Sequence, residues 1–172
     1  HLPNYLEDAA FAKWRRLPEH PGGAWLAATC NPFAGREPHR SELGHGLAAC
    51  DETEPLWLSP AWAIGALAAQ SVARFGWPTH LAKWRQVALH GLPGIDTGDR
   101  PIPTAVAFPR ERLQQFKAAG ISPLAVEPGR AEAFLPHAVT VSGQRLEPAL
   151  YLNRVVAFLI QLHEAAGTLP SE

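Results

Sequence analysis

The sequence contains no methionine, only two cysteines and no long apolar run. Cys30 and Cys50 are too few for the disulfide framework of a small secreted domain, so a reducing, cytoplasmic location is expected. The longest apolar stretch, around 155–162, is far shorter than the roughly 18 residues that span a bilayer. The 15 Lys and Arg residues against 16 Asp and Glu leave no basic excess. We therefore expect neither nucleic acid nor membrane as a partner.

The composition of the chain is that of a globular protein. Its 172 residues are 47% hydrophobic and 18% charged, which predicts one domain with a substantial core. The chain starts at His1 and has no methionine, so we expect residues 1–172 to be a single domain or lobe excised from a longer protein. A cleaved secretory signal would leave the same mark.

Proline and glycine divide the chain into periodic segments. Ser59-Pro60 is a helix start, and Gly76 is placed to end that helix. The last helix should turn Leu152, Val155, Val156, Leu159, Ile160 and His163 inward. The patterns predict helices over 5–17, 61–75, 109–119 and 149–166, and strands over 24–29, 78–89, 104–108, 121–126 and 137–142, with an irregular segment over 31–55. The expected fold is α/β (α+β), a mixed sheet covered by helices.

Motifs of common enzymes are absent from the sequence. It has neither of the two glycine-rich phosphate-loop patterns, G-x-G-x-x-G and G-x-x-x-x-G-K-[ST]. It also has no G-x-S-x-G nucleophile elbow. His163 could be a general base, but a lone histidine on an apolar helix face is more often part of the core. We therefore expect no catalytic residue, no cofactor and no enzymatic activity.

One group of residues has the ligand types of a zinc site. Cys30, His39, His45 and Cys50 offer two thiolates and two imidazoles within the irregular segment. Their gaps are wider than the pairs of closely spaced ligands in structural zinc sites. The alternative, which we favour, is a core Cys30 with solvated histidines and no metal.

Six tryptophans stand out in a chain without catalytic motifs. Large aromatic side chains stabilise cores and are enriched at the centres of protein interfaces. Packing inside the domain and packing against a neighbouring protein both remain open for each of them. They are Trp14, Trp25, Trp57, Trp62, Trp77 and Trp84.

A series of short motifs, in a fixed order over about residues 9–163, resembles one known family. The motifs are Phe11-Ala12-Lys13-Trp14-Arg15, Leu26–Gly35, Leu56-Trp57-Leu58-Ser59-Pro60-Ala61, Phe75-Gly76-Trp77, Gly91-Leu92-Pro93, Pro103-Thr104, Arg110-Glu111-Arg112-Leu113, Gly120–Leu124, Ala133-Phe134 and Leu150–His163. In this order they resemble the C-terminal half of the large subunit of the type VI secretion contractile sheath (TssC/VipB/EvpB/ImpC). The chain departs from the family pattern at Ala105, at Gln86-Val87 and at Asn31.

The resemblance implies a structural role in protein secretion. Sheath subunits of this family pair with a small sheath subunit (TssB/VipA-like) and self-assemble into a tube around the inner tube protein Hcp, on a baseplate. Contraction of the sheath drives the inner tube outward, and an AAA+ unfoldase recycles it. The resemblance and the tryptophan pattern mark as structural or interface candidates Trp14, Trp57, Trp77, Pro103, Thr104, Arg110, Glu111 and Phe134.

Two alternatives to a sheath subunit or sheath-subunit-like lobe remain open. The first is a reduced, sheath-like accessory binding module of the same machine. The second, which we favour less, is a small zinc-binding protein or enzyme that uses the 30–50 segment.

Overall fold

The structure, a computed structural model, describes residues 2–38, 54–83, 85–96, 101–127 and 131–167. Its helices are α1 (Leu2–Leu6), α2 (Ala12–Arg16), α3 (Pro60–Phe75), α4 (Arg110–Ala118) and α5 (Leu146–Gly167), with 3-10 turns η1 (Ala9–Phe11), η2 (Leu17–Glu19) and η3 (Pro21–Trp25). Its strands are β1 (Ala28–Cys30), β2 (Phe33–Arg36), β3 (Leu56–Leu58), β4 (Leu89–His90), β5 (Ile121–Pro123), β6 (Ala125–Val126) and β7 (Glu132–Phe134). This mixture of helices and strands confirms the predicted α+β class.

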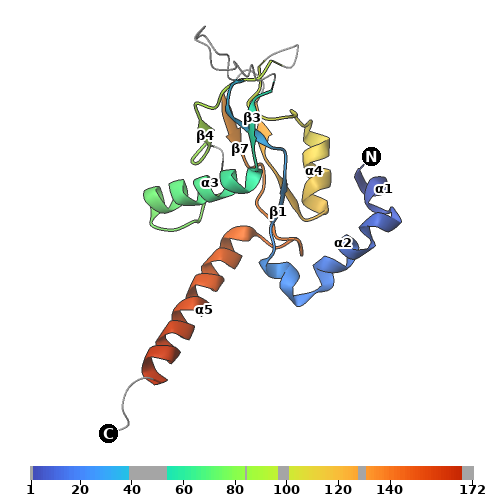
Figure 1. The fold of residues 1–172 in the computed structure, drawn as a ribbon. Helices are drawn as coiled ribbons and strands as arrows, with labels where there is room; N and C mark the ends of the chain where they lie inside the picture. The colour runs from blue at the N-terminus through green and yellow to red at the C-terminus, as the bar shows by residue number, and fades with distance from the viewer. Residues whose placement is uncertain (1, 39–53, 84, 97–100, 128–130, 168–172) are drawn as a thin grey trace, which may run out of the picture.

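The strands described here pair in three small sheets. β1 pairs in parallel with β5, β2 pairs antiparallel with β3, and β7 lies between β4 and β6 in an antiparallel sheet. Helices α3 and α4 flank the strands on opposite sides in Figure 1. The N-terminal arm of α1, α2 and the 3-10 turns contacts the body through α4.

Helix α3 begins and ends where the sequence predicts. The Ser59 hydroxyl accepts a hydrogen bond from the Ala61 N–H at 3.3 Å, and Pro60 occupies the first turn. Gly76 adopts φ +72°, and its N–H donates to the Val72 carbonyl. The prediction of a helix that starts after Pro109 is also confirmed by α4, which Gly120 follows at φ +69°.

Several predicted elements differ because side chains bind the backbone. The helix expected over 5–17 is broken at Asp8, whose carboxylate accepts the Ala10 N–H at 2.8 Å and starts η1. The strand expected over 104–108 is reduced to a bridge at Thr104, since the Asn31 side chain binds both the N–H and the carbonyl of Val106. Over 137–142 the Ser122 hydroxyl accepts the Val139 N–H, and no strand forms.

Other boundaries were placed wrongly in the sequence analysis. The strand expected over 24–29 begins only at Ala28, after η3. Of the strand expected over 78–89, only β4 at its end forms, and the Ser71 hydroxyl accepts the His80 N–H near its start. Strands β2, β3 and β7 were missed; β2 lies within the segment expected to be irregular and β3 just after it.

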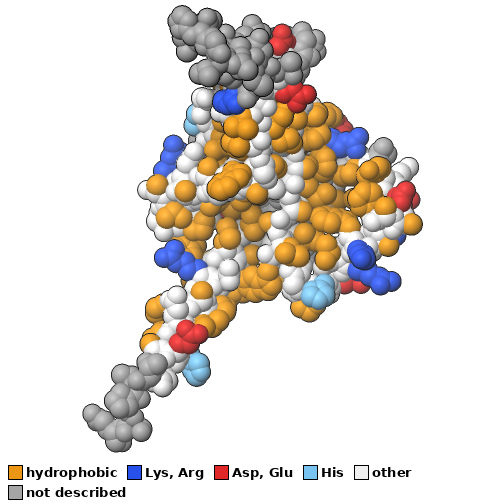
Figure 2. Space-filling view, in the orientation of Figure 1, with side chains coloured by type: hydrophobic (Ala, Val, Ile, Leu, Met, Phe, Trp, Pro, Cys, Tyr) orange, Lys and Arg blue, Asp and Glu red, His pale blue; other side chains and the backbone are white. Residues whose placement is uncertain are grey.

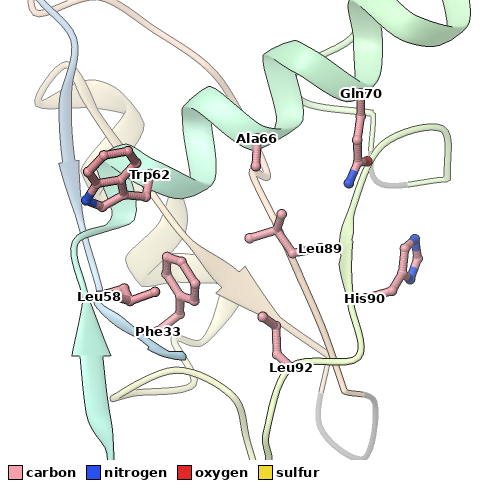
Figure 3. A pocket seen from close by; sticks show the side chains of 8 residues that line it. All are labelled: Phe33, Leu58, Trp62, Ala66, Gln70, Leu89, His90 and Leu92. Atoms are coloured by element: carbon pink, nitrogen blue, oxygen red, sulfur yellow. The ribbon is translucent and has the colours of Figure 1, made fainter. Parts of the chain in front are cut away.

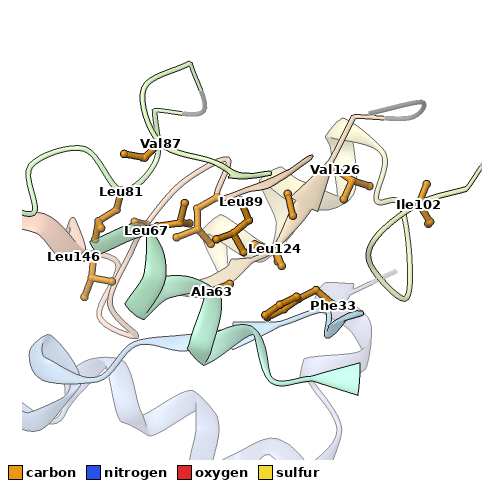
Figure 4. Packing of buried hydrophobic residues seen from close by; sticks show 13 residues of the cluster. Phe33, Ala63, Leu67, Leu81, Val87, Leu89, Ile102, Leu124, Val126 and Leu146 are labelled. Atoms are coloured by element: carbon orange, nitrogen blue, oxygen red, sulfur yellow. The ribbon is translucent and has the colours of Figure 1, made fainter. Parts of the chain in front are cut away.

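The hydrophobic core lies between α3 and the strands (Figure 4). Leu67, Leu81, Leu124 and Leu135 are completely buried. Phe33 reaches the core from β2, and Leu146 reaches it from the first turn of α5. These side chains come from both halves of the chain, so the body folds as one packed unit.

Helix α5 points away from this body for most of its length (Figure 1). The predicted inward face is therefore wrong: Leu152, Leu159 and Ile160 are each at least half exposed, and His163 is exposed too. Only Leu146 and Glu147 of this helix are buried. None of the described helices is long and apolar enough to cross a membrane.

Candidate interaction surface

The main candidate surface is the exposed apolar side of α5. Its large side chains are between 40% (Val156) and 59% (Phe158) exposed. Leu152, Val155, Leu159 and Leu162 follow one another at spacings of three, four and three, which places them in one line along the helix. We call these four residues the α5 seam. Figure 2 shows hydrophobic side chains along the projecting helix.

The other side of α5 is polar or small. Asn153, Arg154, Gln161 and Glu164 lie away from the seam by their helical positions. Arg154 and Glu164 are the only Asp, Glu, Lys or Arg residues between 149 and 166. The helix is thus amphipathic, with a wide uncharged apolar side on which Leu152 and the large side chains from Val156 to Leu162 are exposed.

The base of α5 is fixed to the body by Trp77. The Trp77 ring meets the Tyr151 ring edge-on, with centroids 5.0 Å apart and an interplanar angle of 70°. The Arg154 guanidinium lies 5.2 Å from the same ring centroid. Leu146, only 5% exposed, anchors the first turn in the core. These contacts hold the helix in its projecting position. Leu152, Leu159 and Leu162 of the seam stay at least half exposed, whereas Val155 is half-buried.

A second candidate surface is a groove beside α3. It has a volume of about 400 Å³. Trp62 forms part of its wall and is 72% exposed, so a large aromatic face is available to a partner. Figure 3 shows its lining residues, Phe33, Leu58, Trp62, Ala66, Gln70, Leu89, His90 and Leu92.

Two polar side chains line the groove among these apolar ones. His90 Nδ1 lies 3.3 Å from Glu132 Oε1 at an exposed position. Gln70 Oε1 is buried and has no hydrogen-bond partner within the described residues. The groove is therefore lined mainly by apolar side chains and can take apolar side chains of a partner.

The candidates predicted from the sequence lie in different parts of the molecule. Pro103 and Thr104 are fully buried: the Pro103 carbonyl accepts the Ala34 N–H at 2.9 Å, so both are structural and unavailable to a partner. Arg110 and Glu111 are exposed at the start of α4. The other four candidates are half-buried aromatic residues, namely Trp14, Trp57, Trp77 and Phe134.

Trp14 and Trp77 have packing roles within the chain. Trp14 lines a cavity of about 420 Å³ between the N-terminal arm and Gly120. Trp77 lies against α5 as described. Trp84 lies outside the described residues, whereas Trp25 is 51% exposed.

The zinc hypothesis gains nothing from the described residues. Burial raises the pKa of the Cys30 thiol to about 11, which disfavours the thiolate that a metal needs. His39, His45 and Cys50 lie outside the described residues. In the part of the chain that the structure describes, no three potential metal ligands come together.

Two histidines, His163 and His137, differ in their burial. His163 is exposed on α5, so the prediction of a core histidine is wrong there. His137 is buried, and its Nε2 lies 2.9 Å from the Ile121 carbonyl oxygen. Burial lowers the pKa of the His137 imidazole because it penalises the charged form.

Sequence signals for both surfaces existed. On α3, Trp62 shares its helical side with Gly65, Ala66 and Ala69, opposite the side of the buried Leu67 and Ser71. On α5, the run from Val155 to Ile160 is apolar on more than one side, which is too wide for a helix that packs on one face only.

No protein-family model matches this chain, and no curated protein matches it. The resemblance to sheath large subunits therefore rests on the short motifs alone.

Proposed function

We propose that this chain is a structural subunit of a protein assembly, and that the assembly is a contractile sheath of the type VI secretion kind. The single observation that carries the proposal is the uncovered apolar side of α5. The role requires no catalytic residue and no cofactor. Its chemistry is the burial of one protein surface against another.

The amount of apolar surface on α5 supports an assembly. Its seven exposed large side chains together leave on the order of 600 Å² open to water, as much as the largest patch on a typical monomer. A specific protein interface needs roughly 800 Å² per partner. Helix α5 with its flanking residues supplies most of that area, so a partner that covers it would bind stably.

The places of the resembling motifs in the fold support the sheath interpretation. Phe75-Gly76-Trp77 closes α3 and supplies the ring that supports α5. Pro103-Thr104 holds β2 through the Ala34 hydrogen bond. Leu150–His163 forms the projecting helix itself. Two of these three motifs thus build or support the proposed interaction surface, and the third holds a strand of the body.

A contractile sheath stores energy in the packing of its subunits. Each subunit has two arrangements against its neighbours, and the free-energy difference between them adds up over the polymer. A rigid body with a projecting apolar helix suits such a role, because the body keeps its shape while the helix contact transmits the movement. The partners implied are the small sheath subunit, the inner tube protein Hcp and further copies of the sheath.

A second candidate function is an accessory binding module of the same machine, favoured by the groove beside α3. An apolar segment of a partner could insert one or two side chains beside Trp62. Trp62→Ala should then weaken capture of that partner at least tenfold. Trp25→Ala removes another exposed tryptophan that lies outside the groove, and it should leave capture unchanged.

The experiment is co-expression of the chain with a small sheath subunit of the TssB/VipA kind. A tag on one protein is used for purification, and the eluate is observed by negative-stain electron microscopy. Co-purification with tubes supports the sheath role. A stoichiometric complex without tubes supports the accessory module. A chain that leaves the small subunit in the flow-through contradicts both.

A further inference from the structure

We propose that two copies of this chain pair through α5 in an antiparallel arrangement, with the α5 seam of one copy against the seam of the other. The inference rests on the proposed function, in which an assembly covers the apolar side of α5. It deepens that function by naming a second copy of the chain as one partner of this surface. It is argued from the residues of α5 alone.

The spacing of the seam fits a helix pair. Leu152, Val155, Leu159 and Leu162 take alternate core positions of two successive heptads, the pattern by which two helices interlock. All four are branched aliphatic residues. The neighbouring positions, Val156 and Phe158 among them, are apolar and exposed, so they extend the contact on both sides of the seam.

The register follows from matching the large side chains. In an antiparallel pair the two kinds of core position face each other, so Leu152 of one copy lies opposite Leu162 of the second copy, and Val155 lies opposite Leu159. The same register sets residue 149 opposite residue 165. The exposed part of α5 is therefore overlapped over nearly its whole length, so each copy covers the seam of the other and the apolar residues that flank it.

The charges on α5 are compatible with self-pairing. Arg154 and Glu164 both lie on the side away from the seam, so no like charges meet when two identical helices pair. The body is attached at the N-terminal end of α5. An antiparallel pair places the two bodies at opposite ends, whereas a parallel pair would bring them together beside the same end. This two-fold contact is isologous, the commonest form of self-association.

The first test is the oligomeric state of the purified chain, measured by sedimentation velocity and light scattering over a range of concentrations. We expect a monomer–dimer equilibrium with dimer prevailing at tens of micromolar. Leu159→Glu should weaken the dimer at least 100-fold. Gln161→Glu adds the same charge on the opposite side of the helix and should leave the dimer intact. Circular dichroism should show that both variants keep the fold, because neither residue lies in the core.

The second test is disulfide trapping, which reports the orientation. In a background with Cys30→Ala and Cys50→Ala, the Leu152→Cys/Leu162→Cys chain should form a covalent dimer on mild oxidation. Either single cysteine variant should not, because each faces a leucine of the second copy. Efficient cross-linking of the Leu152→Cys variant alone would indicate a parallel pair and overturn the proposal.

A monomeric wild-type chain, or a dimer that Leu159→Glu leaves unchanged, would also overturn it. Neither result bears on co-purification with the small sheath subunit, so failure of the pairing and failure of the proposed function are distinguishable. Conversely, a dimer that ignores the small subunit would keep the α5 pair and remove the sheath role.

Discussion

At the scale of single residues, Asn31 joins two segments that are far apart in the sequence. It is 5% exposed and has φ +78°, a conformation that asparagine tolerates better than most residues. Its side-chain N–H groups donate to the carbonyls of Val106 and Leu124 at 2.8 and 2.7 Å, and its Oδ1 accepts the Val106 N–H at 3.1 Å. One amide thus satisfies three backbone groups, and its bond to the Leu124 carbonyl is buried.

Replacing Asn31 should therefore destabilise the body strongly. We expect Asn31→Ala to lower the free energy of unfolding by about 2 to 4 kcal/mol, because it leaves those backbone groups unsatisfied and strains the alanine. Asn31→Gly should cost less, since glycine accepts the positive φ. Urea unfolding of the three proteins measures this. Equal stability of wild type and Asn31→Ala would show that the amide contributes nothing.

The buried His137 should make stability depend on pH. Its pKa is lowered in the folded state, so below the ordinary histidine value of 6.5 the unfolded chain binds more protons than the folded chain. The free energy of unfolding should therefore fall as the pH drops from 7.5 to 5, and His137→Gln should flatten that slope. His163→Gln replaces an exposed imidazole and should leave the pH dependence of the free energy of unfolding unchanged. A slope that is identical in all three proteins would contradict the assignment.

At the scale of elements, the end of α4 depends on a glycine that lies close to another segment. Gly120 has φ +69°, and a Cβ atom there would lie 2.4 Å from the Val141 carbonyl oxygen. Gly76 at the end of α3 has φ +72° but nothing within 4 Å of the corresponding position. The two glycines therefore have the same conformation and different surroundings.

This difference gives a matched pair of substitutions. Gly76→Ala should cost about 1 kcal/mol for the left-handed conformation alone. Gly120→Ala must also move the backbone at Val141 and should cost more than about 3 kcal/mol. Thermal or urea unfolding of both variants checks the order. Equal losses would show that the packing of α4 against the Val141 segment is loose.

The same elements show what could be predicted from the sequence. Helix α3 was placed correctly because Ser59, Pro60 and Gly76 act locally, within one turn of the ends that they define. The strands at 104–108 and 137–142 were placed wrongly because Asn31 and Ser122, which are distant in sequence, bind their backbone instead. Side-chain hydrogen bonds over such separations leave no periodic signal.

The direction of α5 was unpredictable for a related reason. Its length and boundaries follow from apolar periodicity, and the structure confirms a helix there. Periodicity gives the apolar side of a helix but not what covers that side. Of the candidate residues, Pro103 and Thr104 were placed in the core only once β2 and its hydrogen bond to Pro103 were known.

At the scale of the whole molecule, the chain consists of a packed body and a helix that contacts this body near its N-terminal end. The core contains Leu146, and Leu150 packs against it, but no residue of α5 beyond them belongs to that cluster. Tyr151 and Arg154 complete the contact with Trp77. A chain shortened to residues 1–154 therefore keeps the core contacts of Leu146 and Leu150 and both contacts with Trp77.

We expect this shortened chain to unfold within about 3 °C of the full chain, because the large side chains removed are exposed apart from the half-buried Val155, and none of them belongs to the core. Leu146→Ala in the full chain, by contrast, should cost about 2 to 4 kcal/mol, since it empties a buried position. Differential scanning calorimetry compares the two. If the unfolding midpoint of the shortened chain lay far below that of the full chain, and the midpoint of Leu146→Ala did not, the projecting part of α5 would stabilise the body itself. If the midpoints follow the expected order, then the apolar residues beyond 154 contribute nothing to the stability of the single chain, and contact with another protein is what their burial would stabilise.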